Sequence, residues 1–198
     1  MATPKTSRKS MPDKNDAIAL LKADHREVED AFEKFMKARD NDRRQELATQ
    51  ICNALKVHTT IEEEIFYPAF LAATNDTDLH HEAEVEHDGA KKLIADIEAS
   101  SADDEYFKAK MTVLSEMIKH HVNEEEKRGG MFAEARHADM DLLALGEQLA
   151  ARKSELEDSG GRKGAHTASS SRGNQNAEVG EELWSSRGDD RKHRHAGR

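Results

Sequence analysis

Apolar residues recur along most of the chain at alternating spacings of three and four positions, the pattern of helices that pack in a bundle. Four long segments carry this pattern between short polar stretches, and they cover residues 14–39, 43–73, 79–99 and 103 up to the Gly129-Gly130 pair. A fifth amphipathic segment follows at residues 137–157. Short connections place consecutive helices antiparallel, so the sequence predicts an all-α, up-down-up-down four-helix bundle with an extra C-terminal helix.

The two ends of the chain lack this periodicity. Residues 1–13 are polar, and residues 158–198 are rich in Gly, Ser and charge with few aliphatic side chains. Such segments bury too little apolar surface to fold alone, so we expect a disordered lead, a bundle domain over residues 14–157 and a disordered tail. The tail contains one candidate recognition motif, "AEVGEELWSS" around Trp184; the alternative is a linker with an incidental tryptophan. Within the second helix, Pro68 predicts a kink or an early end.

Charge and composition exclude several classes of protein. The net charge is −10, and residues 160–198 hold eight Lys or Arg against five Asp or Glu, so the acidity lies in the bundle. An acidic domain does not suit the phosphate backbone, so we expect no nucleic-acid partner. No apolar run could span a membrane, and the N-terminus lacks the apolar middle of a secretory signal. With Cys52 as the single cysteine, no internal disulfide can form, and we expect a soluble, cytoplasmic protein.

The core-facing stripes of the four helices are apolar except at six positions. They run through Ile18, Leu21, His25, Val28, Phe32 and Phe35 in the first helix, Ile51, Leu55, His58, Glu62, Ile65 and Ala69 in the second, Ala83, His87, Ala90, Ile94 and Ile97 in the third, and Phe107, Met111, Leu114, Ile118, His121 and Glu125 in the fourth. Nearby polar residues fall outside the stripes and are expected on a solvated face, namely Glu63, Glu64, His120, Glu124 and Glu126. Of the three consecutive glutamates, Glu62 is therefore the inward one.

The depths of these polar residues in the bundle can be compared. His25 lies about 15 residues before the first turn and His58 about 15 after it, so at 1.5 Å per residue the two should be level. Glu62 and His87 are similarly level across the second connection. His87 and His121 match less well, with a difference of about two turns on the expected helix boundaries.

Six inward polar residues at one level require a compensating charge. An isolated buried carboxylate costs several kcal/mol, and no lysine or arginine lies on any stripe, which leaves metal cations. Two His-x-x-x-Glu units, His58 with Glu62 and His121 with Glu125, allow two carboxylates to bridge two metals with imidazoles completing their shells. Mixed nitrogen and oxygen ligands favour iron or manganese over a cysteine-bound zinc or iron–sulfur site. For any single histidine, a hydrogen bond to a backbone carbonyl remains the simpler explanation.

The segments that contain these residues, "LLKADHREVEDAF", "HTTIEEEIFYPAF", "EVEHDGAKKLI" and "HHVNEEEKRGGMFAEAR", resemble the bacterial hemerythrin-like (HHE cation-binding domain) family. The resemblance covers residues 14–157 and implies an oxo- or hydroxo-bridged non-haem di-iron centre. It implies terminal histidine ligands and bridging glutamates at His25, His58, His87, His121, Glu62 and Glu125. Oxygen-carrying hemerythrins have a fifth histidine one turn after the third-helix histidine, where this chain has Lys91. His80 shares the face of His87 but lies two turns away, too far along the axis for a ligand.

The leading functional hypothesis is a di-iron protein that binds O2 or reacts with peroxide or NO, because fewer histidines leave coordination positions open. The alternative is a sensing or metal-storage module without turnover, whose tail contacts a partner. A metal-free structural bundle is the third hypothesis. Asp24 and Glu86, which adjoin two of the histidines in sequence, are expected either to orient imidazoles or to lie on the solvated surface. Met111, Met117, Ile118 and Phe66 either fill the core or control access to the centre, and core filling is the simpler reading.

Overall fold

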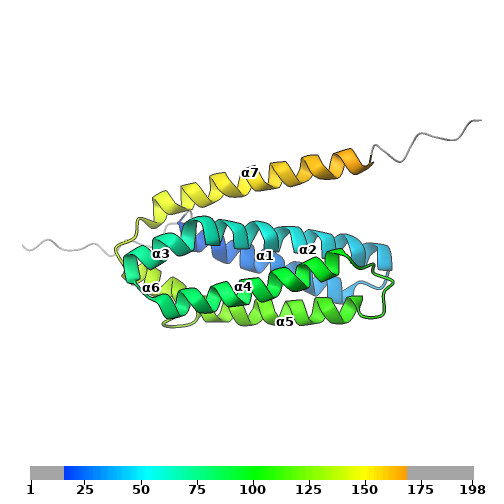
Figure 1. Ribbon diagram of the computed structural model, residues 1–198, viewed down its shortest axis with the longest axis horizontal. Helices are drawn as coiled ribbons and strands as arrows, with labels where there is room; N and C mark the ends of the chain where they lie inside the picture. The colour runs from blue at the N-terminus through cyan, green and yellow to red at the C-terminus, as the bar shows by residue number, and fades with distance from the viewer. Residues whose placement is uncertain (1–15, 169–198) are drawn as a thin grey trace, which may run out of the picture.

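The computed structural model describes residues 16–168, and the predicted N-terminal lead and Trp184 lie outside the described residues. The predicted all-α fold is confirmed, since every regular element of the described residues is helical. Four long helices form an antiparallel bundle (Figure 1), namely α1 (Ala17–Lys37), α2 (Asn41–Ile61), α4 (Thr77–Glu98) and α5 (Phe107–Glu126).

Three of these helices begin at an aspartate. The carboxylates of Asp16, Asp40 and Asp76 accept the backbone N–H three residues ahead, at 2.7, 2.9 and 3.2 Å. An aspartate at this position satisfies an N–H that has no partner in the helix and places negative charge at the positive end of the dipole. These caps fix where α1, α2 and α4 start, and therefore the depth of each side chain that follows.

The second predicted helix is continuous but contains one π-helical turn. α2 passes into η1 (Glu62–Phe66) and then into α3 (Tyr67–Thr74), and the N–H of Tyr67 donates to the carbonyl of Glu62, five residues back. Pro68 lies in the first turn of α3 and does not end the helix, which continues to Thr74. Asn75, at φ 56°, adopts the left-handed conformation that terminates it.

The π-turn changes which residues face the core. It adds one residue to the turn, so the buried face beyond it moves by one position. Ile65 and Ala69, predicted on the inward stripe, are only half-buried against the smaller cluster, and Phe66, Tyr67 and Phe70 are fully buried instead. The stripes predicted for the first, third and fourth helices are buried throughout, because no such turn interrupts α1, α4 or α5.

The apolar core consists of two clusters, one toward each end of the bundle. The larger cluster contains Phe35, Ile51 and Ile94, and the smaller contains Leu21, Phe66 and Phe132. α1, α2 and α4 contribute to both clusters, α5 contributes to the larger one and α6 (Met131–His137) to the smaller, and the inward polar residues lie between the two. The polar residues therefore form a layer between the two apolar clusters.

Two further helices complete the fold. α6 (Met131–His137) closes one end of the bundle with buried Met131 and Phe132, and α7 (Leu142–Ala168) lies along α1 and α2 (Figure 1). The predicted fifth helix thus begins five residues later than expected, at Leu142, after α6 has ended at His137. It continues to Ala168, so the boundary predicted at residue 158 is not its end. That segment contains no proline, and each added residue contributes a backbone hydrogen bond. Within residues 16–168, no helix combines the length and apolarity that a membrane span requires.

Gly129 and Gly130 connect α5 to α6 and provide a matched pair of substitutions. A β-carbon on Gly130 would lie 2.9 Å from the backbone oxygen of Glu125 and closer still to that of Glu124, whereas one on Gly129 meets nothing within 4 Å. We expect Gly130→Ala to destabilise the fold by about 3 kcal/mol through overpacking. Gly129→Ala should cost about 1 kcal/mol, from its φ of +77° alone. Urea denaturation of both variants tests this, and equal losses would contradict the packing described.

Candidate metal centre

The structure brings all six predicted site residues together in the polar layer. His25 comes from α1, His58 from α2, Glu62 from the π-turn, His87 from α4, and His121 and Glu125 from α5. Their exposed fractions lie between 0% and 5%. Six ionisable side chains are thus removed from water within a shell of apolar residues.

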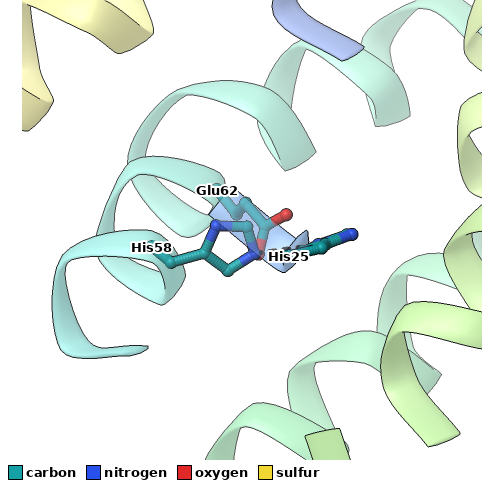
Figure 2. Close-up of side chains that lie close together, drawn as sticks. All are labelled: His25, His58 and Glu62. Atoms are coloured by element: carbon teal, nitrogen blue, oxygen red, sulfur yellow. Dashed lines mark hydrogen bonds and ion pairs between the residues drawn. The ribbon is translucent and has the colours of Figure 1, made fainter. Parts of the chain in front are cut away.

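One half of the centre is formed by His25 and His58, whose Nε2 atoms lie 3.1 Å apart. The Nε2 of His58 is 3.2 Å from Oε2 of Glu62, and the Nε2 of His25 is 3.4 Å from Oε2 of Glu125. Figure 2 shows His25, His58 and Glu62 converging from three different elements. Donor atoms of these three residues lie within 4.8 Å of one another, close enough to share one metal ion.

The other half repeats this arrangement with His87 and His121, whose Nε2 atoms are 3.2 Å apart. Oε2 of Glu62 lies 3.4 Å from Nε2 of His87, and Oε2 of Glu125 lies 3.7 Å from Nε2 of His121. Glu62, His87 and His121 form a second group with the spacing of a metal site. The mismatch of two turns predicted between His87 and His121 is wrong, because α5 begins at Phe107 and not at residue 103.

The side chains themselves fit a cation. Oε1 of Glu62 and Oε2 of Glu125 are buried without a hydrogen-bond partner. Two imidazole nitrogens that face each other at 3.1 Å can share only one hydrogen, so the histidine pairs are also incomplete as hydrogen bonds. Unpaired buried oxygens and nitrogens are costly unless a positive ion binds them. The donor set, four imidazoles and two carboxylates, is suitable for iron or manganese.

Comparison with known proteins agrees with this geometry. The family described as "Hemerythrin HHE cation binding domain" matches residues 16–129, more than half of the chain. The chain belongs to the hemerythrin HHE cation-binding family. The matched segment holds all six residues of the centre.

Two relatives of this hemerythrin-like protein are informative. The crystal structure of a hemerythrin HHE cation binding domain-containing protein from Mycobacterium kansasii superposes with a TM-score of 0.64 at 24% identity, covering 73% of this chain and 88% of that one. At this identity the likeness supports the fold alone. A protein named DNA nickase, from Nostoc sp., is 29% identical over 107 residues, which is 54% of this chain and 30% of that protein. The hemerythrin-like chain therefore spans less than a third of this relative's length.

Tyr67 is a residue of the centre that the sequence pattern missed. Its hydroxyl lies 3.2 Å from Nε2 of His87, 3.2 Å from Oε1 of Glu125 and 3.5 Å from Oε2 of Glu62. Burial, together with the charges of Glu125 and Glu62, raises the pKa of the phenol well above its ordinary value, so the hydroxyl remains a donor. Tyr67 is off the stripe of a regular helix and faces inward only because of the π-turn. The available signal of an irregular turn was Pro68, which has no N–H to donate to a carbonyl of the preceding turn.

Each histidine of the hemerythrin-like centre also has a carboxylate near its outer nitrogen, Nδ1. The oxygens of Glu126, Glu63 and Glu86 lie 2.8, 2.8 and 2.7 Å from the Nδ1 atoms of His25, His87 and His121. The fourth pair is longer: Oδ2 of Asp24 is 3.6 Å from Nδ1 of His58, an ion-pair distance, and this nitrogen has no hydrogen-bond partner. Such carboxylates fix the tautomer and orientation of an imidazole and increase its basicity.

The four carboxylate–histidine contacts connect neighbouring helices in a closed ring around the bundle. α1 supports the histidine of α2, the π-turn supports that of α4, α4 supports that of α5, and α5 supports that of α1. Each carboxylate is the sequence neighbour of a predicted ligand on its own helix. That adjacency was the available signal.

These contacts correct several predictions of residues on the solvated face. Glu63 and Glu126 are half-buried, not fully solvated, and the surface alternative for Asp24 is wrong because Asp24 is 8% exposed. Glu64 and His120 are exposed as predicted, whereas Glu124 is half-buried and pairs with Lys127. A carboxylate next in sequence to a predicted ligand therefore contacts a histidine of the centre where the adjacent helix places one beside it.

Without a metal, the carboxylates favour protonated imidazoles. Burial alone lowers the pKa of His58, but the charge of Glu62 and the carboxylates of Asp24 and Glu62 raise it to about 10. Burial likewise opposes charge on His87, yet Glu62 and Glu63 raise its pKa to about 9. The pKa of Glu62 is correspondingly held well below its ordinary value by His58 and His87, against the effect of burial. The carboxylates of the layer thus favour positive charge on His58 and His87.

Lys91 occupies the position at which oxygen-carrying hemerythrins have a fifth histidine. Its Nζ lies 2.6 and 2.5 Å from the two oxygens of Glu63, outside the layer of inward donors. His80 belongs to neither metal-capable group and contacts the ring of Tyr67, with 5.9 Å between centroids. Neither side chain adds a nitrogen to the centre.

Proposed function

We propose that the protein is a non-haem di-iron protein that binds O2 or reacts with a small oxidant, peroxide or NO. The observation that carries the proposal is the position of Glu62 and Glu125, each of which contacts one histidine of each half. Two carboxylates that reach both halves suit a pair of metal ions better than a single ion. Iron is the proposed metal, and manganese is the competitor that the same ligands accept.

The chain's own residues have distinct tasks in this proposal. His25, His58, His87 and His121 would hold the outer positions, and Glu62 and Glu125 would bridge. When bound, two ferrous ions would supply two electrons, which together with two protons would convert one molecule of hydrogen peroxide into two of water. The apolar clusters on both sides exclude bulk water, and the Tyr67 hydroxyl offers a hydrogen bond in the middle of the layer.

The space around the centre favours a very small ligand. A cavity of about 10 Å³ adjoins the four histidines, with Val28, Leu55 and Ile118 in its wall, and it has room for about one water-sized molecule. A hollow of about 190 Å³ between α4 and α5 ends at His87 and His121, and Ala90, Met117 and Ile118 line it. The cavity beside the four histidines is too small for an organic substrate. Met111 and Phe66 are fully buried and fill the core, as expected.

Rapid mixing of ferrous-loaded protein with O2, peroxide or NO tests the proposal. We expect near-ultraviolet bands of a ferric pair with O2 or peroxide, or an iron–nitrosyl spectrum with NO, together with loss of the added reactant. Consumption of many equivalents per iron would indicate an enzyme, and a single stoichiometric event would indicate the sensing or storage alternative. A ferrous-loaded protein that reacts with none of the three would contradict the proposed function.

A further inference from the structure

The four carboxylates that support the histidines have a common feature, in that each also pairs with a second basic side chain. Glu126 pairs with Lys22 at 3.0 Å and with Arg26 at 2.5 Å. Glu63 pairs with Lys91, and Glu86 pairs with His120 at 3.2 Å. In these three cases the basic residue belongs to the four-helix bundle, and it holds the carboxylate from the outer side.

The fourth carboxylate, Asp24, obtains its basic partner from outside the bundle. Nζ of Lys153 on α7 lies 2.7 Å from Oδ1 of Asp24. Residue 153 lies beyond the segment that matches the family, residues 16–129. The basic partner of Asp24 therefore lies on a helix that the family match does not include.

Asp24 has few alternatives to this contact. It is 8% exposed, so water replaces a lost partner poorly, and its other oxygen is 3.6 Å from Nδ1 of His58. A buried carboxylate that loses its partner moves toward another donor or toward water. Such a move would take away the carboxylate that faces Nδ1 of His58, a buried nitrogen without a hydrogen-bond partner.

We propose that Lys153 is a positioning residue of the metal centre, so that docking of α7 and metal binding by the His25–His58 half stabilise each other. This inference rests on the proposed function, because it requires a metal to be bound. Coupling of this kind is reciprocal: if docked α7 strengthens metal binding, bound metal strengthens the docking of α7 by the same factor. α7 then reports on the occupancy of a centre that lies inside the bundle.

The neighbouring residue provides a matched control. Arg152 also joins α7 to the bundle, with Nε 2.7 Å from Oε2 of Glu64, but Glu64 is exposed and contacts no histidine. Lys153→Met and Arg152→Met each remove one ion pair between α7 and the bundle, and only the pair of Lys153 involves a carboxylate that faces a histidine of the centre. Lys153→Arg keeps the charge and serves as the conservative variant.

The experiment measures metal release from the loaded full-length protein. Each variant is loaded with ferrous iron without oxygen, and loss of iron to excess chelator is followed over time. We expect Lys153→Met to release half of its iron about tenfold faster than the wild type, the lower end of the usual effect of such supporting residues. Arg152→Met should release iron like the wild type, and Lys153→Arg should recover most of the difference.

Hydrogen exchange of α7 gives a second readout that does not depend on activity. In the wild type, amides around residue 153 should exchange more slowly with metal than without it, and Lys153→Met should lose this difference. Equal release by Lys153→Met and Arg152→Met, or metal-independent exchange of α7 in the wild type, would overturn the inference. A wild type that binds no iron would instead refute the proposed function itself.

Discussion

Replacing Glu62 by alanine is expected to remove metal from both halves of the centre. Glu62 is fully buried and contacts His58 on one side and His87 on the other, so its loss leaves both halves with one carboxylate fewer. We expect the metal content to fall from about two ions per chain to near zero, since each ion would lose an anionic ligand. Elemental analysis of purified, buffer-exchanged protein measures this directly.

Glu64→Ala is the control for this substitution. Glu64 lies two residues further along the same π-turn, is exposed, and pairs with Arg152. It should retain full metal content and lose little stability, because an exposed ion pair contributes little. His58→Ala should have an intermediate effect, with metal lost mainly from its own half. A metal-free structural bundle predicts the opposite for Glu62→Ala, namely a more stable protein, and that outcome would exclude the metal centre.

The metal-free protein is expected to lose stability as the pH rises from about 6.5 to about 10. His58 and His87 have folded-state pKa values of about 10 and about 9, against an ordinary value of 6.5. Groups whose pKa is raised by folding stabilise the fold fully below their unfolded pKa, and this contribution is lost as the pH passes the folded pKa. Each unit of pKa corresponds to about 1.4 kcal/mol, so the total loss is on the order of several kcal/mol.

At acid pH the sign reverses. The pKa of Glu126 is held at about 2, because its contacts with His25 and Lys22 outweigh the opposing effect of burial. Its stabilising contribution is present above the ordinary value of 4.5 and is lost as the pH falls toward 2. The metal-free protein should therefore be most stable between about pH 4.5 and 6.5.

Chemical denaturation of chelator-treated and metal-loaded protein across this range tests the prediction. In the loaded protein, metal replaces the protons on the inner nitrogens, so the alkaline loss should largely disappear. Metal-free stability that stays constant from pH 6.5 to 10 would show that the buried imidazoles are not protonated in the fold.

Much of the centre could be predicted from periodicity, because α1, α4 and α5 are regular helices. Along them, His25, His87, His121 and Glu125 fall at core positions, and the structure places them there. His58 and Glu62 were also predictable, since both precede or begin the π-turn. The depth of each residue in the bundle depends on where its helix begins and ends. The predicted difference in depth between His87 and His121 was wrong because the expected helix ends were inaccurate.

The rest depended on features that a regular helical repeat does not contain. The π-turn moved Tyr67 into the layer and left Ile65 half-buried at the edge of the core. The carboxylates that support the histidines, such as Glu63 and Glu126, act across to a neighbouring helix. A one-helix pattern assigns such residues to the surface, because it carries no information on what the next helix presents.

The proposal of a di-iron centre is tested most directly by loading wild-type protein with ferrous iron without oxygen, removing excess metal and then admitting air. We predict about two irons per folded chain and new near-ultraviolet absorption bands of a ferric pair, as expected for carboxylate-bridged iron in a helical bundle. A protein that remains folded, retains no iron and develops no bands under air would contradict this proposal.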